Sequence, residues 1–134
     1  MDTKTRAMVL PGKSGVEVPG ILRDLEAATP GSIVPKPLEN TVCHCVGYSL
    51  LDRNGHMNNT RYLDWIDDLL PADFHAAHPV RELSLCYLSE AREGQQISLD
   101  WELTDTHLLA VELHRPKEDD SGTDERVFAA HVQF

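Results

Sequence analysis

Apolar positions in the middle of the chain recur with the period of a helix. Over residues 58–70, one apolar stripe occupies positions i, i+3, i+4 and i+7, namely Tyr62, Trp65, Ile66 and Leu69. Residues at this spacing share one face of a helix, so the stripe predicts an amphipathic helix that buries one side. Pro71 ends the predicted helix, because proline lacks the backbone N–H that a helix interior requires.

Other segments alternate apolar and polar residues, as strands with one buried face do. Strands are predicted over five segments: Thr41–Ser49, Val80–Leu88, Gln96–Thr104, His107–Arg115 and Arg126–Phe134. Because a single helix cannot bury its own apolar face, the strands must form an antiparallel sheet that wraps around it. The sequence therefore predicts an α+β fold with one long central helix.

The first 40 residues have a different composition. They hold five of the eight prolines and four of the eight glycines, with one short helical pattern over 21–28 and a possible strand over 1–9. We predict that residues 1–40 are a linker that follows the end of a preceding domain, and that residues 41–134 form the folded domain. The acidic segment 116–125 is predicted as a loop between the last two strands.

The net charge of −10 comes from residues 41–134, which contain seven basic and seventeen acidic residues. This charge argues against nucleic acid as a partner, because nucleic-acid binding depends on neutralising phosphates. Neither a secretory signal nor a run of about 20 apolar residues is present, so we expect a cytoplasmic protein that does not enter a membrane.

Cys43, His44 and Cys45 resemble a fragment of a metal site. On a strand, however, the two cysteines face one way and the histidine the other. No second Cys/His pair follows at ligand spacing, so we predict reduced thiols, no metal and no cofactor.

The segment directly ahead of the predicted helix is unusually polar. It holds Asp52, Asn54, His56, Asn58 and Asn59 within eight positions. One such residue suffices to cap a helix, so the remaining ones indicate a functional site. A helix N-terminus also presents unpaired N–H groups, which suit a carbonyl oxygen that becomes an oxyanion.

The pattern Asp52-x-Asn54-x-His56-x-Asn58-Asn59 resembles the active-site signature of acyl-acyl-carrier-protein thioesterases. Hotdog acyl-CoA thioesterases share a looser form of it. Asn54 between the acid and the histidine favours the carrier-protein family, and so does Glu90 after a strand, where that family places a catalytic glutamate. The resemblance runs from about residue 41 to the C-terminus and implies a hotdog fold that hydrolyses fatty acyl thioesters.

Two departures from the family limit what the resemblance implies. The family has two hotdogs joined by a linker, and residues 1–40 resemble that linker, so the first hotdog is missing from this sequence. Chain-length preference is therefore not carried over. Ala91 stands where plant members have a cysteine once proposed as the nucleophile, which excludes a thiol mechanism at this position.

The chemistry expected from these residues uses carboxylates and water. Asp52 and Glu90 are the candidates for general base or nucleophile, and the sequence leaves open which acts. His56 would orient or transfer a proton. Asn54 would hold the water or a carboxylate. No serine lies in the context of a Ser-His-Asp hydrolase.

The expected oxyanion site lies at the start of the helix. Backbone N–H groups near Met57 and Asn58 are predicted to bind the oxyanion, with Asn59 as a further substrate contact. The remaining histidines are expected to be structural or solvated: His75, His78, His107, His114 and His131.

Two other functions stay open at this point. A hotdog hydratase or dehydratase would abstract a proton next to the thioester carbonyl, and a truncated hotdog could bind a partner without turnover. A hotdog with a free edge strand is expected to form a homodimer or to pair with another hotdog. An acidic carrier protein would have to dock on a local basic patch, for which Arg53, Arg61 and Arg92 are nearest in sequence.

Overall fold

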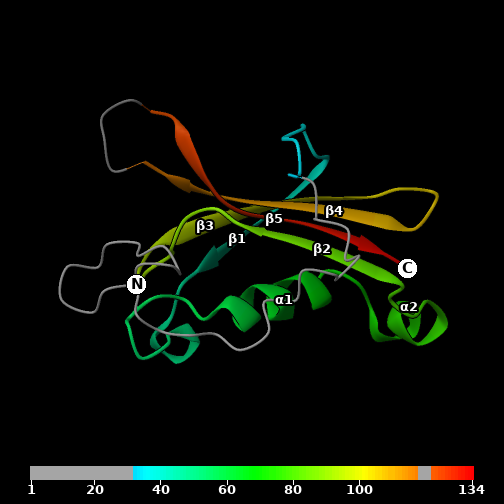
Figure 1. Cartoon of the computed structure of the whole chain (residues 1–134), viewed down its shortest axis with the longest axis horizontal. Helices are drawn as coiled ribbons and strands as arrows, with labels where there is room; N and C mark the ends of the chain where they lie inside the picture. The colour runs from blue at the N-terminus through cyan, green and yellow to red at the C-terminus, as the bar shows by residue number, and fades with distance from the viewer. Residues whose placement is uncertain (1–31, 118–121) are drawn as a thin grey trace, which may run out of the picture.

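A computed structural model describes residues 32–117 and 122–134 of the chain (Figure 1). The helix predicted over 21–28 and the strand predicted over 1–9 lie outside these residues. The described elements are, in order, β1 (Asn40–Cys45), a 3₁₀ turn (Tyr48–Leu50), α1 (Asn59–Asp67), α2 (Ala72–Ala77), β2 (Glu82–Tyr87), β3 (Gln96–Leu103), β4 (Leu108–Pro116) and β5 (Asp124–Gln133).

The five strands form one antiparallel sheet in the order β1-β3-β4-β5-β2. Helix α1 lies along one face of this sheet (Figure 1). The prediction of an antiparallel sheet packed on a central helix, the hotdog arrangement, is confirmed. Strands β1 and β2 form the two edges of the sheet.

The core lies between α1 and the central strands. On β4 and β5, apolar residues pair directly across the sheet: Leu109 with Val132, Val111 with Ala130, and Leu113 with Phe128. The predicted stripe of α1 supplies Tyr62, Trp65 and Ile66, all buried against them. Each large side chain buried in this way stabilises the fold by about 1.5–3 kcal/mol. The apolar faces of the strands and the apolar stripe of α1 therefore pack together in a single core.

Several predicted boundaries differ from the structure: α1 ends at Asp67 rather than at residue 70, and β5 begins at Asp124 rather than at Arg126. The first strand was expected to reach Ser49, but β1 ends at Cys45 and a 3₁₀ turn follows. The Val46 N–H donates to the carbonyl of Gln95 before the chain leaves the sheet. The residues after Pro71 form α2, a helix that the sequence pattern did not predict. Pro71 is the N-cap of α2, and an acid in the first turn, Asp73, complements the helix dipole.

The segment 32–39 lies across the face of the sheet opposite α1 (Figure 1). The Arg126 guanidinium donates to the carbonyl of Ile33 at 2.8 Å and pairs with the Glu112 carboxylate at 3.0 Å. That carboxylate also accepts from the Lys36 N–H at 3.2 Å. The assignment of residues 1–40 as a linker stays a prediction. Within the described residues, no helix is long and apolar enough to cross a membrane.

Candidate active site

The polar segment ahead of α1 folds into a tight loop that Asp52 organises. The Asp52 N–H donates to the carbonyl of His56 at 2.8 Å. One Asp52 carboxylate oxygen accepts from the N–H of Asn54 at 2.8 Å and from the N–H of His56 at 3.2 Å. Gly55 occupies the left-handed region with φ of 76°, which glycine adopts without strain. The residues on either side of the loop, Leu51 and Met57, form an isolated bridge that closes it.

These hydrogen bonds hold the pKa of the Asp52 carboxyl below its ordinary value. The main cause is the hydrogen bond from the Asn54 backbone, and partial desolvation opposes it. The His56 N–H and the Asn54 side chain lower the pKa further. Asp52 is therefore an anionic group at neutral pH. Asn54 thus contacts the Asp52 carboxylate directly.

The second part of the site comes from the end of β2. An irregularity in the pairing of β4 with β5, after Leu113, places one extra residue, Val127, in β5. The Val127 carbonyl accepts from the N–H groups of Leu88 and Ser89 at 2.9 and 3.0 Å. A bulge thus redirects the chain after β2, a common role for bulges beside functional sites. Glu90 follows directly.

Glu90 and His56 meet across these two segments. Nε2 of His56 lies 3.1 Å from a carboxylate oxygen of Glu90. The His56 side chain is 18% exposed and that of Glu90 is 66% exposed, so the pair faces solvent from the glutamate side. The backbones are joined as well. The Met57 N–H donates to the Ala91 carbonyl at 2.7 Å, and His56 and Arg92 form an isolated antiparallel β-bridge.

The start of α1 is capped by Asn58 rather than by Asp52. The Asn58 side-chain oxygen accepts from the N–H of Thr60 at 3.0 Å and from its hydroxyl at 2.9 Å. The N–H groups of Met57 and Asn58, in the region predicted to bind the oxyanion, already donate hydrogen bonds to backbone carbonyls. Met57 donates to the Ala91 carbonyl and Asn58 to the Leu50 carbonyl at 2.9 Å.

Asn59 is the residue at the helix start that retains a free amide. Among the described residues, no hydrogen bond uses its N–H or its side chain. Its carbonyl accepts from the Tyr87 hydroxyl at 3.0 Å, which ties the helix start to the end of β2. The free N–H lies in the first turn of α1, where the helix dipole favours negative charge.

All seven predicted site residues lie on one cavity of about 470 Å³. The cavity is lined by Asp52, Asn54, His56, Met57, Asn58, Asn59, Tyr62, Tyr87, Leu88, Ser89 and Glu90. Sequence reasoning missed the aromatic part of this wall. Tyr62 was assigned to the core stripe, and it does pack on Phe128 with ring centroids 5.0 Å apart. Burial raises the pKa values of the Tyr62 and Tyr87 hydroxyls, which keeps both neutral.

The other histidines lie away from this cavity. His114 contacts the carboxylate of Glu112 at 3.3 Å on the opposite side of the sheet from α1. His44 stacks on Trp65 with ring centroids 4.5 Å apart, while Cys43 and Cys45 are exposed. Within the described residues, no group of three or more His, Cys, Asp or Glu side chains could hold a metal ion.

The fold and site define a hotdog domain with a carboxylate–histidine pair at the start of its central helix. A sequence model described as the acyl-ACP thioesterase C-terminal domain matches residues 39–134. The chain belongs to the acyl-ACP thioesterase family. A search of curated proteins found no significant match.

Solved structures show the same fold. An acyl-ACP thioesterase from Bacteroides thetaiotaomicron VPI-5482 matches with a TM-score of 0.65 and 23% identity, covering 98% of this chain and 51% of that one. A 4-hydroxybenzoyl-CoA thioesterase from Pseudomonas sp. strain CBS-3 matches with a TM-score of 0.53 and 13% identity, covering 69% and 80%. A hexameric hotdog thioesterase from Campylobacter jejuni matches with a TM-score of 0.53 and 16% identity, covering 68% of this chain and 77% of that one. This chain thus spans about half the length of the Bacteroides protein.

Proposed function

We propose that this protein hydrolyses fatty acyl thioesters carried by acyl carrier protein, with water as the attacking group. The observation that supports this best is the contact between His56 and Glu90, 3.1 Å apart on a cavity that also contains a free helix N-terminal amide. Membership of the acyl-ACP thioesterase family favours the same reaction. Hydrolysis of a thioester needs an activated water, an oxyanion site and a route for one proton.

In the proposed mechanism, the His56–Glu90 pair removes a proton from water as the water oxygen attacks the thioester carbonyl carbon. The carbonyl oxygen gains the negative charge and accepts from the Asn59 N–H. When the tetrahedral intermediate collapses, the C–S bond breaks and the pair returns the proton to the thiolate. The products are a free fatty acid and a carrier thiol. Atoms and charge balance without a cofactor.

Asp52 has a different role in this proposal. One of its oxygens is already bound by two backbone N–H groups of its own loop, from Asn54 and His56. A carboxylate held in this way sets the orientation of the loop, and through it the position of His56. This favours Glu90 over Asp52 as the group that activates water. Direct attack by Asp52 on the thioester is the alternative, and it predicts a different response to Asp52→Asn.

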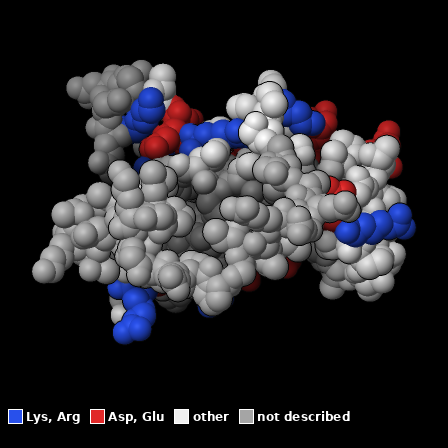
Figure 2. Space-filling view, in the orientation of Figure 1, with Lys and Arg blue, Asp and Glu red and all other residues white. Residues whose placement is uncertain are grey.

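Carrier protein rather than CoA is proposed as the substrate's carrier, on the strength of the family and the basic residues near the cavity. On the face in Figure 2, acidic and basic side chains of the described residues lie beside one another. Arg61 is paired with Asp64 at 2.9 Å. Among the described residues, Arg53 and Arg92 make no ion pair, so they remain as docking contacts for an acidic carrier. Because the net charge is −10, this docking depends on local contacts rather than on long-range attraction.

The edge of the sheet at β2 supports a homodimer as the working form. Four large apolar side chains in and around β2 are 44–53% exposed: Val80, Leu83, Tyr87 and Leu88. An exposed apolar edge strand favours pairing with another strand. Tyr87 and Leu88 also line the cavity, so pairing at this edge would close one side of the site. Light scattering at working concentration tests this, and a clean monomer mass would contradict it.

The reaction is tested by following free thiol with a panel of acyl thioesters on carrier protein and on CoA. The proposal predicts thiol release with one fatty acid formed per thiol, and a higher kcat/KM for carrier protein. A preference for CoA would instead favour the acyl-CoA thioesterase alternative. A change in enoyl absorbance without thiol would indicate a hydratase, and neither signal would indicate a domain that only binds.

A further inference from the structure

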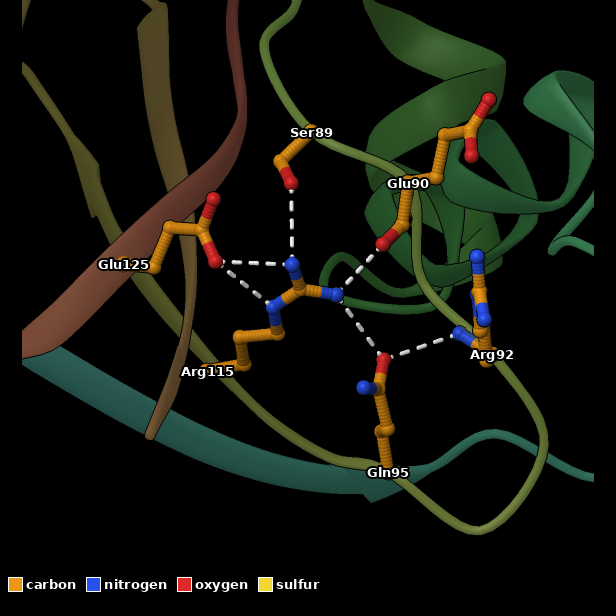
Figure 3. Close-up of a pocket in the computed structure, with 6 residues that line it drawn as sticks. All are labelled: Ser89, Glu90, Arg92, Gln95, Arg115 and Glu125. Carbon is orange, nitrogen blue, oxygen red and sulfur yellow. Dashed lines mark hydrogen bonds and ion pairs between the residues drawn. The ribbon is translucent and has the colours of Figure 1, made fainter. Parts of the chain in front are cut away.

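A second cavity, of about 550 Å³, lies beside the first and shares Ser89 and Glu90 with it. Its lining is polar and is formed by Ser89, Glu90, Arg92, Gln95, Arg115 and Glu125 (Figure 3). The Glu90 backbone carbonyl points toward this second cavity, and the carboxylate points away from it (Figure 3). The short segment that ends β2 therefore separates two cavities, and its backbone and side chain face different ones.

Arg115 occupies the centre of the second cavity. Its Nη1 donates to the Glu90 carbonyl and, at 3.0 Å, to the side-chain oxygen of Gln95. Its Nη2 donates to the Ser89 hydroxyl at 3.0 Å. Both Nε and Nη2 donate to one carboxylate oxygen of Glu125, at 3.0 and 2.7 Å. The planar guanidinium thus binds four partners at once, which a lysine cannot do.

Glu125 makes the arginine's position stable. The Arg115 side chain is only 17% exposed, so its charge needs a partner. Hydrogen bonds from Arg115 hold the pKa of the Glu125 carboxyl below its ordinary value, so the counter-charge persists across the neutral range. The pair also joins neighbouring residues of β4 and β5 at the register position Arg115↔Glu125.

The segment 89–92 is consequently held from two sides. On the side of the catalytic loop, the Ala91 carbonyl accepts from the Met57 N–H at 2.7 Å. On the other side, Arg115 binds the Glu90 carbonyl, and the Arg92 N–H donates to Gln95 at 2.9 Å. Successive peptide groups around Glu90 are therefore anchored in opposite directions.

The anchored backbone helps to hold the Glu90 carboxylate against His56. The Glu90 side chain is 66% exposed, so little packing fixes it. Holding an exposed glutamate side chain in one rotamer costs conformational entropy. A mobile backbone would add to this cost, so a fixed backbone at Glu90 favours the contact with His56. A displacement of about 1 Å in a catalytic group can cost about 10²-fold in rate.

We propose that Arg115 is a positioning residue that fixes the Ser89–Arg92 segment and thereby sets the Glu90 carboxylate against His56. The inference rests on the proposed hydrolysis for its kinetic test, but the geometry it describes exists with or without turnover. Arg115 itself lies outside the catalytic cavity and touches no reacting atom. It acts through the Glu90 backbone.

Arg126 provides a matched control. It also lies in the sheet, pairs with one carboxylate, Glu112, at 3.0 Å and donates to one backbone carbonyl, that of Ile33. Its contacts lie on the face of the sheet opposite α1. A purely structural role of Arg115 would make Arg115→Gln and Arg126→Gln alike: both would lower thermal stability and leave the turnover of the folded protein unchanged.

The kinetic test measures kcat and KM for Arg115→Gln and Arg126→Gln, each also in a Glu90→Gln background. We expect Arg115→Gln to lower kcat by about 10- to 100-fold with KM nearly unchanged. The same change in the Glu90→Gln background should lower kcat no further. Arg126→Gln should keep the wild-type kcat. A full additional loss in the Glu90→Gln background, or a wild-type kcat for folded Arg115→Gln, would overturn the proposal.

A second readout keeps this test separate from the proposed function. The ¹⁵N chemical shifts of the His56 ring report its tautomer and hydrogen bonding without any substrate. We expect Arg115→Gln and Glu90→Gln to move these shifts in the same direction, and Arg126→Gln to leave them unchanged. Unchanged His56 shifts in Arg115→Gln would overturn the inference even if the wild type hydrolyses thioesters. If the wild type releases no thiol, the proposed hydrolysis fails and the shifts alone decide.

Should Arg115→Gln not fold, Arg115→Lys replaces it, because it keeps a charge beside Glu125 and loses the planar fork. A lowered kcat with displaced His56 shifts supports the proposal, and wild-type values of both contradict it.

Discussion

Nε2 of His56 and a carboxylate oxygen of Glu90 lie 3.1 Å apart. In the sequence, His56 precedes α1 and α2, and Glu90 follows them. The loop before α1 presents the histidine, and the end of β2 presents the glutamate. The Met57 N–H and the Ala91 carbonyl join the two backbones next to this contact. The pair therefore depends on two segments that are distant in the sequence and that meet only in the assembled domain.

Asp52→Asn is expected to keep most of the activity, within about tenfold of the wild-type kcat, because the amide oxygen can still accept from the Asn54 and His56 N–H groups. Asp52→Ala removes the acceptor, so both thermal stability and kcat should fall. Steady-state kinetics and thermal unfolding of the two variants check this. If Asp52→Asn were as inactive as a variant without the general base, the mechanism in which Asp52 attacks the thioester would be the better account.

Ala91→Cys is expected to change turnover little. The Ala91 side chain is fully buried, so a sulfur there would be a buried thiol, and burial disfavours the reactive thiolate. Overpacking should cost about 1–3 kcal/mol of stability. The measurement is kcat before and after treatment with iodoacetamide. The wild type is a suitable control, since its exposed Cys43 and Cys45 report alkylation outside the cavity. A large gain in rate that alkylation abolishes would show that a thiol mechanism is latent at this position.

His131 should make the domain less stable in mild acid. Burial lowers its pKa in the folded state below the ordinary value near 6.5, and the positive charge of Lys36 contributes. Below about pH 6.5 the unfolded chain therefore binds more protons at this residue than the folded one, so the free energy of unfolding falls as the pH drops toward the folded pKa. Glu112 opposes this shift and Arg126 adds to it.

The test compares urea unfolding of the wild type and His131→Gln at pH 7.5 and pH 5.5. The variant lacks the titrating ring, so its free energy of unfolding should decline less between the two values. An equal decline in both proteins would show that other groups carry the acid sensitivity.

Much of the fold followed from local patterns in the sequence. The stripe that includes Tyr62 and Ile66 predicted α1, and alternation predicted the strands, because each pattern reflects burial of one face. The short helix α2 did not follow from the pattern: the residues after Pro71 form only six helical positions, too few for a period to be recognised. The bulge at Val127 was also missed, since nothing local distinguishes an extra residue from a shifted register.

The candidate site was predicted only in part. Asp52, His56 and Glu90 were named as candidates because polar residues at a helix start and the family resemblance pointed to them, and all three line one cavity. The sequence could not show that the Met57 and Asn58 amides already donate to backbone carbonyls, because only the folded chain brings those carbonyls near. Arg115 was read as the end of a strand, since its partners lie on other elements.

The most direct test of the account compares thiol release from an acyl carrier protein thioester by the wild type, Glu90→Gln and Glu93→Gln. Glu93 is a nearby exposed glutamate that forms no ion pair with His56, so it controls for the loss of one charge. Circular dichroism first confirms that all three proteins fold. We predict that the wild type and Glu93→Gln release thiol at similar rates, and that Glu90→Gln is slower by about 10²-fold or more, the scale of a lost general base. Near-full activity of folded Glu90→Gln would contradict the central role of the His56–Glu90 pair.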